Sequence, residues 1–174
     1  MALANAAPTL AETSDFTALV REHQAMVFSL AYHFLGERAA AEELAQDVFM
    51  QLFRHLGRLQ SREHVVFWLR RVTANRCIDE ARRQQRHPEI KLEEMPAPAA
   101  PLQPSDPFVS DRLRRLVAAL PEKSRMFVLL RYQEDLDPAD IAKLMNVPVN
   151  TVKSQLQRAL TMLRQKAENL NWEK

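Results

Sequence analysis

Three carboxylates stand close together in the segment "AAEELAQDVFM", residues 40–50, with no Lys or Arg among them. On a helix, Glu42, Glu43 and Asp47 would lie within about one and a half turns of each other. Glu43 and Asp47 are like charges at i, i+4, which costs an isolated helix roughly 0.2–0.5 kcal/mol. Such a cluster could hold a metal ion, carry out acid–base chemistry, meet a basic partner or simply keep a helix surface hydrated.

The residue types that a catalytic or metal site would need are missing. A carboxylate-bridged di-metal bundle uses Glu-x-x-His pairs, and no Glu of this chain has a His three residues later. The chain has no Gly-rich phosphate loop. Its one cysteine, Cys77, lies mid-helix with no nearby His, which favours a buried structural thiol. We therefore expect no catalytic residue, no metal, no cofactor and no small-molecule substrate, and the protein is not predicted to be an enzyme.

Composition places the chain among ordinary soluble proteins. Of its 174 residues, 47% are hydrophobic and 26% are charged, as in a globular domain. Two glycines and few β-branched runs predict helix nearly throughout. The longest apolar stretch, "MVFSLAYHFL", is shorter than the roughly 20 residues of a membrane span, and no secretion signal is recognisable. A single cysteine fits a reducing compartment, so we expect a cytoplasmic protein without membrane insertion.

The net charge of +2 hides a strong segregation along the chain. Residues 1–53 carry two Arg against seven acids, whereas residues 54–87 carry nine Arg against three acids. Residues 88–110 are acidic again, and residues 111–174 hold twelve bases against eight acids. Two basic segments separated by an acidic one predict two places where a polyanion is held, although two solvated helix surfaces would give the same pattern.

The carboxylates must be positioned by a helix in the first half of the chain. A helix is expected from Asp15 to about Phe34, with Gly36 as its stop. The next helix has an apolar stripe at i, i+3, i+4, i+7, i+8 and i+11, which puts the three carboxylates on its outer face. A third helix is expected over residues 66–86. Its two apolar faces indicate either a bend near Thr73 or burial on two sides.

A proline-rich spacer divides the chain. Proline at this density breaks helices and favours an extended connection; the six residues concerned are Pro88, Pro96, Pro98, Pro101, Pro104 and Pro107. The predicted fold is all-α with two small helical domains. The predicted organisation is a disordered N-terminus at 1–13, a first domain at 14–87, a linker at 88–110 and a second domain at 111–170.

The second half predicts four short helices, of which the last two form a helix-turn-helix. Asp137 can cap the third helix, Pro138 suits its first turn and Asn146 tolerates the left-handed turn that follows. The fourth helix would enter the major groove of DNA. Asn and Gln can read adenine edges there, and Arg and Lys can reach guanine or phosphate. The residues predicted to do so are Asn150, Thr151, Lys153, Ser154, Gln155, Gln157 and Arg158. A plain helical hairpin with a polar outer face is the alternative.

The other basic segment, residues 66–86, interleaves arginines with aromatics. Stacking side chains and cations together suit single-stranded or opened nucleic acid. We expect Phe67 and Trp68 to belong to the core and the arginines to contact phosphates. These arginines are Arg70, Arg71, Arg76, Arg82, Arg83 and Arg86.

Taken together, these segments resemble the sigma-70 family of RNA polymerase sigma factors, in its small extracytoplasmic-function (ECF) form. "AAEELAQDVF" is similar to the family's "DAEDLAQEVF", and "FWLRRVTANRCIDEARR" to its "TWLYRIARNRxLDxxRR". In the second half, "LPEKSRMFVLLRYQEDLDPADIAKLMNVPVNTVKSQLQRAL" follows the family's pattern through the helix-turn-helix. Two motif blocks in order on either side of a spacer are a specific signal.

The resemblance implies a role for each part. The first domain would be a region 2-like bundle that docks on core RNA polymerase and opens the promoter at its −10 element. The second would be a region 4-like domain that reads the −35 element. The core-binding residues implied are Glu42, Glu43, Gln46 and Asp47. The loop that follows the acidic helix would hold a base flipped out of the −10 strand. The implied −10 residues are Leu59, Gln60, Ser61, Arg62, Glu63, His64, Arg71, Asn75 and Arg76.

Four positions depart from the family pattern. Ser61 stands where the family loop has Gly, and Leu59 where it has Phe, so the resemblance leaves open which base the loop holds and how. In the reading helix, Asn150 replaces a usual Gly and Gln155 a usual Arg. Losing that Arg predicts weaker non-specific affinity, and base reading by Asn150 and Gln155 would give an unusual −35 preference.

Core polymerase and promoter DNA are thus the expected partners. An anti-sigma factor that clamps both domains is common in the family, although no residue of this chain marks one. A free-standing helix-turn-helix regulator that never joins polymerase is the alternative, but it leaves the acidic and arginine-rich helices without a role. A third interpretation is that the first half of the chain acts only as an interaction module.

Overall fold

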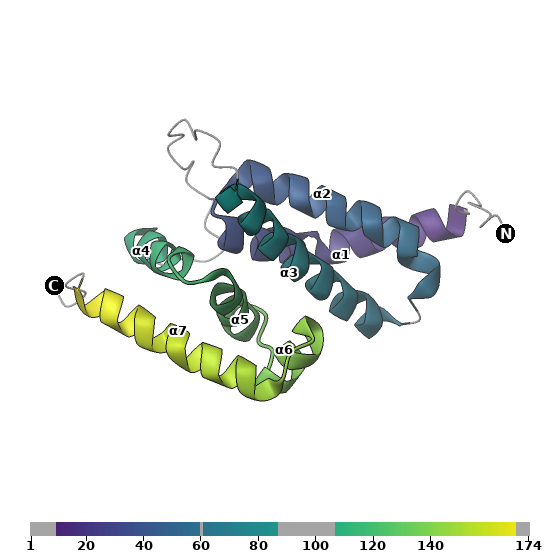
Figure 1. The fold of residues 1–174 in the computed structure, drawn as a ribbon. Helices are drawn as coiled ribbons and strands as arrows, with labels where there is room; N and C mark the ends of the chain where they lie inside the picture. The colour runs from purple at the N-terminus through teal and green to yellow at the C-terminus, as the bar shows by residue number, and fades with distance from the viewer. Residues whose placement is uncertain (1–9, 60, 87–106, 170–174) are drawn as a thin grey trace.

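The computed structural model describes residues 10–59, 61–86 and 107–169, and this part of the chain is built from helices without a strand (Figure 1). The all-α prediction is therefore confirmed. In chain order the elements are α1 (Leu10–Leu35), α2 (Arg38–His55), the 3₁₀ turn η1 (Leu56–Arg58), α3 (Arg62–Arg86), α4 (Pro107–Ala118), α5 (Glu122–Tyr132), α6 (Pro138–Met145) and α7 (Val149–Asn169). None of the described helices is both long enough and apolar enough to cross a membrane.

The helices α1, α2 and α3 pack against one another as a first bundle. Gly36 ends α1 as expected, since its φ of 76° is left-handed and its N–H donates to Tyr32 O at 2.8 Å. The predicted inward stripe of α2 is buried. Phe34 of α1 and Leu52 of α2 are among the largest fully buried side chains of the described residues, and they anchor the core of this bundle.

The second bundle consists of α4 to α7. Helix α7 packs against α4, α5 and α6, and Figure 1 shows α5 and α6 lying between α7 and the first bundle. Its core is formed by the apolar faces of α5, α6 and α7, with Phe127, Leu130, Ile141, Leu144 and Val152 almost fully buried.

Helix α3 is buried on two sides, which settles the alternative left open by its apolar pattern. One side packs against α1 and α2, and another contacts α5 and α6. Val65 and Leu69 are buried, and so are Cys77 and Ile78 of the second apolar face. Thr73 is fully buried at the change between the faces, and its hydroxyl donates to Leu69 O at 2.7 Å.

Helices α1, α3 and α4 begin earlier than the sequence predicts, and α3 is described with its cap below. Helix α4 starts at Pro107, which we assigned to the linker, because proline fits the first turn of a helix, where no N–H donor is needed. Helix α1 starts at Leu10, within the segment predicted as disordered. The expected N-terminus at 1–9 and the remaining linker residues, 87–106, lie outside the described residues.

Candidate protein and nucleic-acid interfaces

The carboxylate cluster lies on the outer surface of α2. All four predicted docking residues, Glu42, Glu43, Gln46 and Asp47, are exposed, opposite the buried stripe of the helix. Arg38 Nε donates to Glu42 Oε1 at 2.8 Å. Glu43 and Asp47 form no ion pair within the described part of the chain. Two carboxylates of this acidic face (residues 42, 43, 46 and 47) are therefore available to an external cation.

Two large apolar side chains extend the acidic face, and the sequence analysis missed them. Met50 is 54% exposed and Phe53 is 37% exposed, and both lie on the outer side of α2. Phe53 is partly covered by Phe16 of α1, whose ring lies edge-on at 5.0 Å between centroids. Exposed Met and aromatic side chains are enriched at protein-binding surfaces. The sequence did contain a signal for their exposure, because neither residue belongs to the inward apolar stripe of α2.

Among the described residues, no group of three or more His, Cys, Asp or Glu side chains is arranged so that it could hold a metal ion. Cys77 is fully buried, as expected for a structural thiol. Burial raises the pKa of this thiol well above its ordinary value, because the thiolate would lose its hydration.

The predicted −10 residues surround the start of α3. Ser61 caps this helix, because its hydroxyl accepts from His64 N at 3.1 Å. Helix α3 therefore begins at Arg62 rather than at Val66, and Arg62, Glu63 and His64 lie in its first turn and not in a loop. The pKa of Glu63 is lowered by a hydrogen bond from its own backbone N–H and by the Ser61 hydroxyl. Leu59 is half-buried, and Gln60 lies outside the described residues.

The cap at Ser61 gives a direct prediction. Ser61→Ala should lower the free energy of unfolding by about 1 kcal/mol, since the N–H of His64 loses its acceptor. Ser61→Gly should cost only a few tenths of a kcal/mol, because glycine leaves that N–H open to water. Urea denaturation followed by circular dichroism measures both. Equal stability of the Ala variant and the parent would show that the cap contributes nothing.

The remaining −10 residues share the outer face of α3. Arg71, Asn75 and Arg76 are all exposed, and their spacing of i, i+4, i+5 puts them on one side of a helix. With the Gln51 amide of α2 turned so that its oxygen faces Arg76, this oxygen accepts from Arg76 Nε at 2.9 Å. Arg76 is thus held by the same helix that carries the acidic face.

The other arginines of α3 have different environments. Arg82 and Arg86 are exposed, as expected. Arg83 pairs with Glu80 of its own helix at 2.9 Å. Arg70 is half-buried and pairs with Glu134 of the second bundle, again at 2.9 Å. Arg70 is thus already paired in this structure, and phosphate contact by the whole set stays a prediction.

The predicted helix-turn-helix is present in α6 and α7. The Asp137 side chain accepts from Asp140 N at 2.8 Å, and Pro138 opens α6. Asn146 ends that helix in the left-handed conformation, with φ 53° and ψ 51°. Val152, Leu156 and Ala159 of α7 face the core. Exposed on the outer side are Asn150, Thr151, Lys153, Ser154, Gln157 and Arg158.

Gln155 has a different position from the other predicted reading residues. Its side chain is half-buried, and its Oε1 accepts from the hydroxyl of Ser124 in α5 at 2.7 Å. Ser124 is itself buried. Gln155 therefore joins the reading helix to α5, and base reading by this residue stays a prediction.

The two roles of Gln155 can be separated by substitution. Ser124→Ala should lower the free energy of unfolding by about 1 kcal/mol, because a half-buried amide oxygen loses its donor. If Gln155 also reads bases, Gln155→Ala should change the preferred −35 sequence, measured by selection from a randomised promoter library. An unchanged preference would leave Gln155 with the structural role alone.

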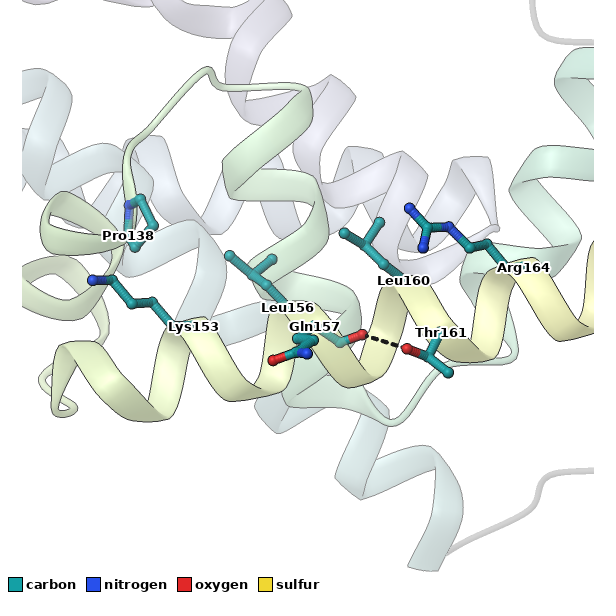
Figure 2. A pocket seen from close by; sticks show the side chains of 7 residues that line it. All are labelled: Pro138, Lys153, Leu156, Gln157, Leu160, Thr161 and Arg164. Carbon is teal, nitrogen blue, oxygen red and sulfur yellow. Dashed lines mark hydrogen bonds between the residues drawn. The ribbon is translucent and has the colours of Figure 1, made fainter.

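A groove of about 390 Å³ runs beside the reading surface, between the start of α6 and the outer flank of α7 (Figure 2). Leu156 and Leu160 provide its apolar lining, and Lys153 and Arg164 lie toward opposite ends (Figure 2). Lys153 therefore belongs both to the predicted DNA-reading surface and to this groove.

Comparison with protein families matches each half of the chain. Residues 19–87 match the model "Sigma-70 region 2", and residues 110–163 match "Sigma-70, region 4". Among curated proteins, the chain is 26% identical to the ECF RNA polymerase sigma factor SigW of Bacillus subtilis, over 89% of this chain and 90% of that protein. It is 32% identical to the ECF sigma factor SigE of Mycolicibacterium smegmatis, over 84% of this chain and 59% of that protein.

Two solved structures share the fold. RpoE of Bartonella quintana, solved in complex with the anti-sigma factor NepR, superposes with a TM-score of 0.71 at 17% identity, over 92% of this chain and 99% of that chain. CnrH, solved in complex with the cytosolic domain of CnrY, superposes with a TM-score of 0.65 at 18% identity, over 90% of each chain.

Proposed function

Because the chain belongs to the sigma-70 family of RNA polymerase sigma factors, we propose that it binds core RNA polymerase and directs it to specific promoters. The acidic face of α2 docks on the polymerase, with Met50 at its edge. The start of α3 and its outer face contact the −10 element and help to open it. Helix α7 reads the −35 element. Proteins of this family initiate transcription without being enzymes themselves.

One observation carries this proposal: three outward surfaces of different character stand on the two matched segments. A carboxylate surface on α2 suits a basic protein partner and repels DNA. The exposed cations of α3 and the polar first turns of α7 suit nucleic acid. A free-standing regulator would use α7 alone and would leave the acidic face without a partner.

The direct test mixes the purified protein with core polymerase. We expect a complex on gel filtration and defined transcription starts on genomic DNA fragments that core polymerase alone does not transcribe. A protein that binds promoter fragments but never co-elutes with core polymerase would instead be a free-standing regulator.

An anti-sigma factor is the further partner that we propose, since RpoE of Bartonella quintana was solved with one and has the same fold. As a sigma factor, the protein would act in the cytoplasm, where polymerase and the chromosome are found. Co-purification of the tagged protein from its own host, followed by mass spectrometry, identifies such a partner.

A further inference from the structure

Gln51 of α2 holds the guanidinium of Arg76 in α3. With its amide turned so that the oxygen faces Arg76, Gln51 Oε1 accepts from Arg76 Nε at 2.9 Å and also from Arg76 Nη2. The opposite orientation would place the amide N–H groups against those of the guanidinium, which has no acceptor atom. The amide oxygen therefore binds two N–H groups on one edge of Arg76, across the contact between α2 and α3.

The part of α2 that carries Gln51 is itself packed on α3. His55 lies one turn after Gln51, and its Nδ1 donates to Gln51 O at 2.9 Å, since a carbonyl oxygen can only accept. The His55 ring lies 5.6 Å from the ring of Trp68 in α3, at an interplanar angle of 35°. Gln51, His55 and Trp68 are all half-buried. The contact of His55 with α3 therefore fixes the backbone from which the amide of Gln51 acts.

The partner of Arg76 is neutral, whereas two other arginines of the same helix have charged partners. Arg70 pairs with the carboxylate of Glu134, and Arg83 pairs with that of Glu80. A carboxylate offsets the charge that its arginine presents to a third group, whereas an amide oxygen orients the guanidinium and leaves its charge intact. Arg76 is exposed, so its remaining N–H groups are accessible to an external anion.

We propose that Gln51 is a positioning residue, which aims Arg76 at a phosphate of the −10 DNA. Arg71 and Asn75 are exposed on the same face of α3, so a fixed Arg76 adds a cation in a defined place beside them. The DNA target rests on the function proposed above, whereas the fixing of Arg76 by Gln51 concerns the free protein.

Fixing Arg76 in advance should strengthen its contact with DNA. An exposed arginine loses rotamer freedom when it binds a phosphate, and this loss of entropy opposes binding. Where an amide already holds the side chain, part of the loss has occurred before the DNA arrives. Gln51 lies one turn after Asp47 of the acidic face, so the helix proposed to dock on polymerase also positions a DNA contact.

The first measurement follows the Nε–H group of Arg76 by NMR relaxation in the full chain, without polymerase or DNA. Its signal is the one that Arg76→Lys removes. We expect a rigid group in the parent and a mobile one in Gln51→Met, which keeps the length of the side chain but has no amide oxygen. Gln24→Met, at an exposed position of α1, should leave the signal unchanged. A mobile Arg76 in the parent would overturn the inference.

The second measurement is the affinity of the assembled holoenzyme for a labelled, forked −10 fragment from a promoter that the parent transcribes. We expect Gln51→Met to weaken binding about fivefold at an unchanged salt slope, because Arg76 still reaches the phosphate but must first be ordered. Gln51→Glu should instead lower the slope of log affinity against log salt by about 0.9, since its carboxylate pairs with Arg76 in place of the phosphate.

A double-mutant cycle separates positioning from a general structural effect. In an Arg76→Ala background, Gln51→Met should cause no further loss of DNA affinity, whereas independent effects would add. Additive losses would overturn the inference, and so would full affinity of Gln51→Met. Circular dichroism checks that each variant is folded, and the salt slope of Gln51→Glu decides the question if Gln51→Met is not.

Failure of the inference differs from failure of the proposed function. A parent that forms no holoenzyme, or that binds the −10 fragment no better than a scrambled one, would overturn the proposed function and with it the DNA target of Arg76. Specific binding by the parent together with an unaffected Gln51→Met would overturn the positioning role alone.

Discussion

Reversing two charges of the acidic face, with Glu43→Lys and Asp47→Lys together, should weaken binding to core polymerase at least about 100-fold. Both carboxylates are exposed and form no ion pair within the described residues, so they are available to a partner's cations. Placing like charges opposite one another across an interface costs several kcal/mol, which accounts for a loss of this size.

The fold should survive this double substitution. Both side chains are far from the buried stripe of α2, and exposed substitutions of this kind change stability by about 0.5 kcal/mol or less. Binding is measured by biolayer interferometry with immobilised core polymerase, and folding by circular dichroism. Asp79→Lys with Glu168→Lys makes the same change of net charge at two other exposed positions. If the charge-reversed variant bound core polymerase normally, the carboxylate cluster would be only a hydrated helix surface.

The second large effect is expected at the reading helix. Lys153→Glu with Arg158→Glu should reduce transcription from a −35-dependent promoter about 100-fold and leave binding to core polymerase unchanged. Both side chains are exposed on α7. Each cation that meets a phosphate contributes about 0.9 to the slope of log affinity against log salt. The slope for DNA binding should therefore fall by about 2.

Fluorescence anisotropy with a labelled promoter fragment at several salt concentrations measures this slope. Lys123→Glu with Arg112→Glu supplies a matched control, because both residues are exposed in the same bundle but lie outside α7. If the control lowers the slope as much as the α7 variant does, net charge and not the reading helix determines the affinity.

Local signals in the sequence were sufficient for the helix-turn-helix of the second bundle. Asp137 and Asn146 act as cap and left-handed turn, as predicted, because each needs only its immediate neighbours. The outward position of the carboxylates followed in the same way from the apolar stripe of α2. Short-range rules of capping and periodicity decide all of these features.

Features that depend on distant residues could not be predicted. Arg70 and Glu134 are 64 positions apart, and nothing in either segment marks the other as its partner. The two apolar faces of α3 showed that something was packed on both, but not that the second bundle supplied the contact. Gln155 was assigned to DNA because its position on the helix suits reading, whereas its partner Ser124 lies on another helix.

The double burial of α3 has a consequence for how the protein unfolds. One face of this helix belongs to the core of the first bundle, and another contacts α5 and α6. Loss of α3 therefore removes support from both bundles, and the protein should melt as one cooperative unit in calorimetry. Helix α1 also contacts α4 and α5. Two helices of the first bundle thereby set whether the two domains behave thermodynamically as one.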